Sequence, residues 1–294
     1  DEYHITYLTT GRDLMRFRSA PVNSYQTDPV VIADPDYDLA SGMPETVSCT
    51  TVVDPIFRRL EWTGIEGQRI AELLQVQPWM GCNALESRLK KLVSPRILHL
   101  ATHGFFSPTT VLPTSGVGNQ SSINQLHINK VEFSDTPIGN NLHNPMLKSG
   151  LVLAGFNTSL KKRPLPADAE DGILTAEDIS GLNLSNTELV VLSACETGLG
   201  DIQDTEGVFG MRRAFVLAGA KTLIMSLWKV ADKQTQELMV GVYRRILSGQ
   251  HRAEALRKAQ LDIRKKYPKP YYWGAFICQG NSSPLPDHGH RQHK

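Results

Sequence analysis

The sequence predicts an α/β fold with a mainly parallel sheet and helices on both of its faces. Short apolar runs rich in Val, Ile and Leu recur along the 294 residues, and segments with helical spacing of apolar residues separate them. Such alternation is typical of strand–helix–strand units, which build parallel sheets. Two of the runs, 98–104 and 190–198, each lead to a reactive side chain and then to glycine. No internal repeat is visible, so we expect one domain over residues 1–280.

Each element in the first half of the chain follows from its local pattern. Residues 29–35 form an apolar run that stops at Asp-Pro, as a buried strand does, and apolar residues in 67–74 share one helical face. A second helix is expected over 83–92, with Asn83 as a candidate N-cap, before the strand that leads to His103. Residues 107–145 are dense in Ser, Asn, Thr, Pro and Gly. A loop of that length is usually functional or disordered.

The second half continues the alternation. Residues 151–155 are a predicted strand, and 175–179 resemble a short capped helix. The remaining elements are the strand that leads to Cys195, helix 206–217, strand 222–228, helix 232–247, helix 253–264 and strand 275–278. The tail at 281–294 is rich in Pro, Gly and His, and we predict that it is disordered.

Composition and charge give no support for a nucleic-acid or membrane partner. The net charge is +1 at pH 7, and no apolar run approaches the roughly 20 residues that span a bilayer. The four cysteines form no Cys-x-x-Cys pair, so we predict neither a metal site nor a cofactor, and such sparse usage indicates a reducing cytoplasm. No signal peptide is visible, and the start at Asp1 indicates a piece of a longer protein.

His103 and Cys195 are the candidate catalytic residues. Each follows a predicted buried strand, and the carboxyl ends of parallel strands meet at one edge of a sheet, where such folds place their sites. A cysteine nucleophile needs thiolate character, and a histidine that titrates near neutral pH can take its proton. The backbone N–H groups of Gly104 and Cys195 could form an oxyanion hole for a tetrahedral intermediate.

Structural interpretations compete with this one. Taken singly, a histidine at a strand end is more often structural, and a cysteine there is more often a small buried residue. His99 lies in mid-strand and is expected to pack under the sheet, and Cys278 lies in an apolar run and is expected in the core. The shared pattern at the ends of two strands favours a Cys-His hydrolase without deciding for it.

Six stretches carry a resemblance to a known family. Ser-Ala-Cys-Glu-Thr-Gly at 193–198 and Ile-Leu-His-Leu-Ala-Thr-His-Gly-Phe-Phe at 97–106 are joined by similar residues at 149–155, 171–179 and 206–232, and by Pro-Tyr-Tyr-Trp-Gly-Ala-Phe at 270–276. From about Val30 to Gly280, the chain resembles the CHAT domain, a caspase-like family of bacteria that often follows TPR repeats.

The resemblance implies both a fold and an activity. The fold would be the three-layer sandwich of the caspase–separase group, with about six strands. The activity would be that of a cytoplasmic cysteine endopeptidase with His103 and Cys195 as its dyad, acting on a protein or peptide substrate. Flexible loops around the site would allow control by an activating partner or an upstream TPR region.

The resemblance also implies a peptide groove. In caspase-like proteases the strand after the cysteine strand pairs with an extended substrate, which here would place Ser226, Leu227 and Trp228 along the groove. Trp228 could equally be a core aromatic. Acidic side chains such as Glu196 and Asp232 would favour a basic residue before the scissile bond, as in related separase-like and metacaspase-like proteins.

Other interpretations of these residues stay open. Asp232 is also a candidate N-cap, and Leu227 and Val230 could line an apolar pocket instead. A catalytically silent module could use the same groove to hold a peptide. A flavodoxin-like nucleotide binder is disfavoured, because Asp34-Pro35-Asp36 stands where a Gly-rich phosphate loop would follow the first strand.

Overall fold

A six-stranded sheet forms the centre of the protein. The computed structural model describes residues 6–8, 10, 11, 13, 15, 17, 27–40, 57–106, 145–147, 149–194, 205–228 and 231–286, apart from the side chains of 106, 145 and 205–209. From one edge to the other, the strands are β2 (Trp79–Gly81), β1 (Val30–Pro35), β3 (Ile97–Ala101), β7 (Leu189–Leu192), β8 (Thr222–Ser226) and β9 (Phe276–Gly280). All neighbours pair in parallel except β8 and β9, which are antiparallel. The mainly parallel sheet of about six strands is therefore confirmed.

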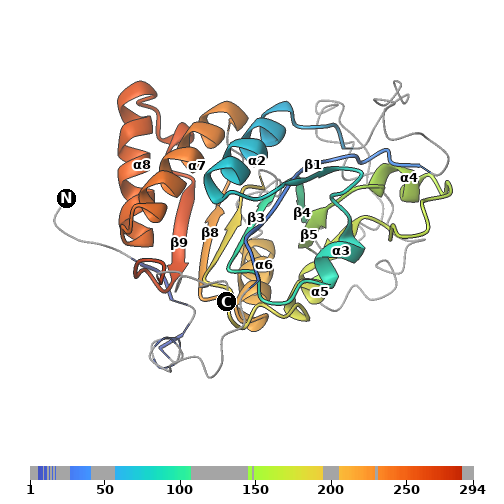
Figure 1. The fold of residues 1–294 in the computed structure, drawn as a ribbon, viewed down its shortest axis with the longest axis horizontal. Helices are drawn as coiled ribbons and strands as arrows, with labels where there is room; N and C mark the ends of the chain where they lie inside the picture. Colours follow the sequence, from blue (N-terminus) through green and yellow to red (C-terminus); the bar gives the residue numbers. More distant parts are fainter. Residues whose placement is uncertain are drawn as a thin grey trace, which may run out of the picture.

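Helices cover both faces of this sheet (Figure 1). One face carries α2 (Glu61–Leu74), α7 (Asp232–Leu247) and α8 (Arg252–Lys266), which pack on Val31, Ile97, Val191 and Ile224. The other carries α3 (Glu86–Lys90), α5 (Ala176–Ser180) and α6 (Thr205–Leu217). Because successive strand residues point to opposite faces, strands that are apolar throughout supply both cores. The three-layer sandwich is thus confirmed.

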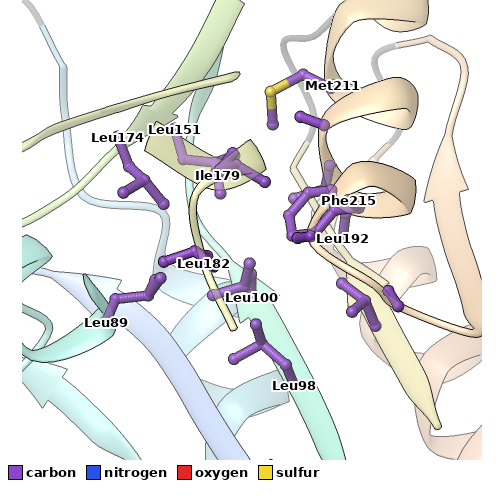
Figure 2. Close-up of a cluster of buried hydrophobic side chains, with 14 of the residues drawn as sticks. Leu89, Leu98, Leu100, Leu151, Leu174, Ile179, Leu182, Leu192, Met211 and Phe215 are labelled. Atoms are coloured by element: carbon purple, nitrogen blue, oxygen red, sulfur yellow. The ribbon is translucent and has the colours of Figure 1, made fainter. Parts of the chain in front are cut away.

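The second core is the larger apolar cluster around α5 and α6. Figure 2 shows Leu98, Leu100 and Leu192 of the sheet facing Met211 and Phe215 of α6. Ile179 of α5 and Leu151 complete the packing, and all of these side chains are buried. Thr175 begins α5 with a capping box, in which its side chain and that of Asp178 each bond the other's backbone. The predicted capped helix is confirmed.

A second, three-stranded sheet lies beside the first. It consists of β4 (Gly104–Phe106), β5 (Ser149–Val152) and β6 (Ile173–Thr175), all antiparallel. The short helix α4 (Phe156–Leu160) follows β5, and the 3-10 turns η3 (Pro145–Leu147) and η4 (Pro270–Tyr272) complete the described elements. The strand predicted near 151–155 therefore belongs to this small sheet, which turns the chain back immediately after His103.

Two helix starts differ from expectation. The N-cap of α3 is Leu85 rather than Asn83, whose backbone N–H instead closes a turn onto the carbonyl of Met80 (3.0 Å). The N-cap of α7 is Ala231, and Asp232 is the first helical residue. The predicted N-caps Asn83 and Asp232 were therefore wrong, by two residues and by one. The backbone conformation before each helix decides at which residue helical dihedral angles begin.

A buried ion cluster joins the ends of three strands opposite the His103 edge. Arg252 is fully buried and donates to Glu188 Oε2 (2.7 Å), the Glu188 carbonyl (2.9 Å) and Thr222 Oγ1. Lys221 Nζ lies 2.6 Å from Glu188 Oε1. The backbone N–H of Arg252 bonds the Ser282 carbonyl (2.8 Å), so the start of the tail is held against the domain rather than disordered as expected. Residues 287–294 lie outside the described residues.

The pKa of Glu188 reflects this cluster. Burial opposes ionisation, but the hydrogen bond from Lys221 and the charge of Arg252 outweigh it and hold the pKa below its usual value. A carboxylate with a lowered folded-state pKa stabilises the fold above its unfolded pKa, about 4.3, and that stabilisation is lost as pH falls through the folded value.

We predict that Glu188→Gln lowers the free energy of unfolding at pH 7 by about 3 kcal/mol, because it leaves the buried Arg252 without its counter-charge. Urea unfolding from pH 7 to pH 3 measures this. The gap between wild type and variant should begin to narrow below about pH 4.3, where Glu188 of the unfolded chain takes up a proton, and should shrink further as pH falls towards the lowered folded-state pKa. A gap that stays constant across this range would contradict the assignment.

Candidate active site

The register between β3 and β7 builds the edge that carries the candidate site. The two strands pair in parallel, from Ile97 opposite Leu189 to Leu100 opposite Leu192. The N–H of Ser193 bonds the carbonyl of Leu100 (2.8 Å), which extends the pairing beyond the strand end. His103 stands three residues after Leu100. Cys195 stands three residues after Leu192 in the sequence, but it lies outside the described residues.

Two aromatic rings pack against the imidazole of His103. The ring centroid of Tyr37 lies 5.4 Å away and that of Phe57 lies 5.0 Å away, and His103 is only 6% exposed. Its Nε2 lies 2.8 Å from the carbonyl oxygen of Arg58. A carbonyl can only accept, so we assign the proton to Nε2. In the neutral ring, the lone pair that takes up a proton is then on Nδ1.

The backbone around His103 is also fixed. The N–H of Val152 donates to the His103 carbonyl (2.9 Å), and Thr102 Oγ1 donates to the carbonyl of Val152. The Tyr37 hydroxyl lies 3.0 Å from Thr102 Oγ1. Gly104 is buried at the start of β4, opposite Leu151. The small sheet therefore holds the turn from which His103 projects, while the oxyanion role of the Gly104 N–H stays a prediction.

Ser226 holds the chain immediately before Cys195. Its hydroxyl donates to the carbonyl of Ala194 (3.0 Å), and its side chain is 1% exposed. The bond joins the carboxyl end of β8 to the segment that follows β7. The structure thus places this predicted groove residue in a buried contact between two strand ends.

The other predicted substrate-binding residues lie beyond β8. Leu227 is half-buried, and its N–H donates to the Ala275 carbonyl (2.9 Å). Trp228 is 37% exposed, so it is not the core aromatic of the alternative interpretation. A Cβ added to Gly274 would lie 3.6 Å from the Trp228 ring, so the ring lies against this glycine. Asp232 opens α7 and is partly exposed, whereas Glu196 lies outside the described residues.

His99 has the structural role expected of it. It is fully buried, with Nδ1 3.1 Å from the Tyr243 hydroxyl and Nε2 3.1 Å from Glu66 Oε1. Burial, with the nearby charge of Glu66, raises the pKa of Tyr243 well above its usual value. This cluster lies beneath α2 and α7, away from the strand ends. Cys278 is likewise a core residue, 4% exposed, and burial raises its pKa to about 12.

Sequence reasoning missed Tyr37, Phe57 and Arg58, which surround the His103 ring. They lie 66, 46 and 45 positions before it, and no local motif connects them with it. Within the described ranges, no group of three or more His, Cys, Asp or Glu side chains could hold a metal ion. Among the same residues, no helix is both long and apolar enough to cross a membrane.

A three-layer α/β sandwich with a buried histidine at the carboxyl edge of its sheet is the class that fold and site define. The family model described as "CHAT domain" matches residues 1–281. The chain belongs to the CHAT domain family, and its three-layer α/β fold agrees with the fold expected from that resemblance.

Curated relatives are much longer than this chain. Tetratricopeptide repeat protein 28 of Homo sapiens is 25% identical over 260 residues, which cover 85% of this chain and 10% of the human protein. The protein of the same name from Mus musculus is 23% identical over 260 residues, again with coverage of 85% and 10%. The chain thus spans about a tenth of the length of these relatives. A bacterial source and a cytoplasmic location stay predictions.

Two solved structures with a similar fold come from a cysteine proteinase and from a complex of pro- and mature domains. The Arg-specific cysteine proteinase gingipain R has a TM-score of 0.43 and 10% identity, with coverage of 88% of this chain and 47% of that chain. The complex of Porphyromonas gingivalis RgpB pro- and mature domains has a TM-score of 0.40 and 10% identity, with coverage of 88% and 48%. Our fold assignment rests on the strand order and the family match instead.

We predict that Ser226→Ala lowers the free energy of unfolding by about 1–3 kcal/mol, because the buried Ala194 carbonyl loses its hydroxyl donor. Ser248→Ala is the matched control, since the Ser248 hydroxyl donates to the Arg245 carbonyl at an exposed position (2.9 Å). Urea unfolding of both variants measures the difference. Equal losses of unfolding free energy in the two variants would show that the buried bond contributes no more to stability than the exposed one.

Proposed function

We propose that this CHAT domain is a cysteine endopeptidase in which Cys195 attacks the peptide carbonyl and His103 transfers protons. The observation that supports this most is the parallel β3–β7 register, since it sets the strand end before Cys195 beside the strand end before His103. The fixed imidazole adds to it, because its Nε2–H is engaged by Arg58 and its basic lone pair is on Nδ1. Both features suit a thiol–imidazole pair.

The proposed reaction has two stages. The Cys195 thiol passes its proton to His103 Nδ1, and the thiolate sulfur forms a bond to the carbonyl carbon of the peptide. His103 then returns that proton to the leaving amine as the C–N bond breaks, which leaves an acyl-enzyme. Water, deprotonated by His103, hydrolyses the thioester. The N–H groups of Gly104 and Cys195 would stabilise the oxyanion in both stages.

The proposed groove runs along the end of β8. Leu227 and Trp228 would contact an extended peptide, with Ser226 holding their strand end to Ala194. The exposed part of the Trp228 ring suits a substrate contact. Asp232 in the first turn of α7, together with Glu196, would favour Arg or Lys before the scissile bond.

Control by another region completes the proposal. The curated relatives are named for tetratricopeptide repeats and are about ten times longer than the matched segment. We infer that an adjoining TPR region or a partner protein activates the site. If the isolated chain cleaves substrate at full rate with no partner, this part of the proposal is wrong.

We expect Cys195→Ala to abolish cleavage and His103→Ala to lower the rate about 10²- to 10⁴-fold, since general acid–base catalysis contributes about that factor. A peptide carrying an electrophilic ketone should label Cys195 rapidly in the wild type. Cys278 is the internal control, because burial and its raised pKa keep that thiol inert. Cleavage by Cys195→Ala would overturn the proposal. Slow, unselective labelling would instead indicate a silent peptide-binding module.

A peptide library tests the pocket. Wild type should prefer Arg or Lys before the scissile bond, and Asp232→Asn should reduce that preference by about tenfold if the carboxylate contacts the cation. Glu237→Gln, farther along α7 and paired with Lys266 (3.0 Å), is the matched control and should leave the profile unchanged. Preference for apolar residues in the wild type would favour a pocket lined by Leu227 and Val230.

A further inference from the structure

The carbonyl that orients His103 belongs to a segment that a buried side-chain amide anchors. Arg58, whose carbonyl accepts from His103 Nε2, directly follows Phe57. Phe57 in turn is bonded to the side chain of Asn157, which lies in α4, 100 positions later in the chain. We propose that Asn157 is the positioning residue that sets the orientation and tautomer of the His103 imidazole. The proposal deepens the proposed function, because it assigns how the general base of that site is held.

Both ends of the Asn157 amide bind the same residue. The Phe57 N–H donates to Asn157 Oδ1 (3.1 Å), and Asn157 Nδ2 donates to the Phe57 carbonyl (2.9 Å). Asn157 is fully buried. A primary amide satisfies a backbone donor and acceptor together, as a neighbouring strand would, so it fixes both position and rotation of that residue. Both polar groups of this buried amide are therefore satisfied by Phe57, as buried polar groups in folded proteins usually are.

The backbone of Asn157 also holds the second aromatic residue beside the histidine. Its N–H donates to the Tyr37 carbonyl (2.8 Å), and the Tyr37 ring lies against His103, with its centroid 6.3 Å from that of Phe57. One residue therefore fixes the two segments that supply both aromatic rings around the imidazole. The Phe57 ring also packs edge-on against Phe156, the residue before Asn157.

A second anchor holds the chain on the other side of Arg58. Arg59 pairs with Asp34 through Nε, 2.9 Å from Oδ1, and through Nη2, and the Arg59 side chain is half exposed while that of Asp34 is 11% exposed. Solvent screens the half-exposed guanidinium, whereas a buried amide that satisfies two backbone groups is costly to lose. The Arg58 carbonyl therefore lies between two anchors, of which the Asn157 amide is the fully buried one.

Loss of this anchor would act on proton transfer rather than on peptide binding. With the Arg58 carbonyl fixed, the proton stays on Nε2 and Nδ1 is basic. When Cys195 gives its proton to Nδ1, the same carbonyl stabilises the resulting imidazolium. A displaced carbonyl would let the imidazole rotate and populate the Nδ1–H tautomer, in which Nδ1 cannot take the thiol proton. The thiolate fraction of Cys195 at neutral pH would fall.

The first test measures alkylation of Cys195 by iodoacetamide against pH in the full chain. We expect Asn157→Ala to lower the rate at pH 7 about 10- to 100-fold, the cost of a misplaced catalytic group, and to move the midpoint towards the pH of a free thiol, about 8.5. Arg252→Lys is the matched control. It perturbs buried bonds to backbone carbonyls at the opposite edge of the sheet, so it should lower stability and leave the pH profile unchanged.

The second test needs no reactivity. Nitrogen-15 spectra of the imidazole rings, with the His103 signals identified by comparison with His103→Gln, should show the Nε2–H form in the wild type. Asn157→Ala should show a mixture of tautomers. If the alanine variant does not fold, Asn157→Ser, which keeps a small polar group, is the second variant to measure. Each spectrum is recorded below the unfolding temperature of its variant. We expect the serine variant to shift in the same direction.

The outcomes separate the two proposals. If wild type and His103→Ala alkylate at the same rate, the proposed dyad fails, while the spectra still decide what Asn157 does. If the dyad holds but an Asn157 variant that folds keeps the wild-type pH profile and the single Nε2–H tautomer, Asn157 is not the positioning residue. A change shared equally by Arg252→Lys would also overturn the assignment, because it would reflect stability alone.

Discussion

The parallel pairing of β3 with β7 is the constraint on which the rest of the molecule depends. It sets Leu100 opposite Leu192, so the segments leading to His103 and Cys195 leave the sheet side by side. Parallel strands must be joined by crossovers, and these crossovers supply the helices of both outer layers. With a helix layer on each face, every residue of β3 and β7 is buried, and their apolar sequence, interrupted only by the hydrogen-bonded His99, follows from that burial.

Polar contacts fix the two edges of this sheet in different ways. At the edge opposite His103, the Arg252–Glu188–Lys221 cluster joins β7, β8 and the start of α8 through charged groups taken out of water. At the His103 edge, the Ser226 hydroxyl donates to the Ala194 carbonyl, and Arg59 pairs with Asp34 near the carboxyl end of β1.

The accuracy with which each element could be predicted from the sequence depended on the length and regularity of its pattern. Long apolar runs correctly predicted β1, β3, β7 and β8, and the period of helix 206–217 matched α6 closely. The small sheet was missed as a separate unit because β4 and β6 are only three residues long. Helix caps failed at Asn83 and Asp232, where a suitable side chain stood near the start but the chain path placed the cap elsewhere.

The sequence by itself determined the strand–helix alternation, the buried structural position of His99 in mid-strand, and the resemblance to the CHAT family that the family match confirms. These features depend on local patterns, which can be recognised from the spacing and the chemical type of the residues in a short stretch. Only the tertiary structure decided what surrounds the imidazole. Tyr37, Phe57 and Arg58 contact His103 through two rings and one carbonyl. Asn157, from a third distant segment, bonds Phe57 and Tyr37. Backbone carbonyls and amides are the same at every residue, so no sequence pattern marks the one that a fold will place beside a histidine.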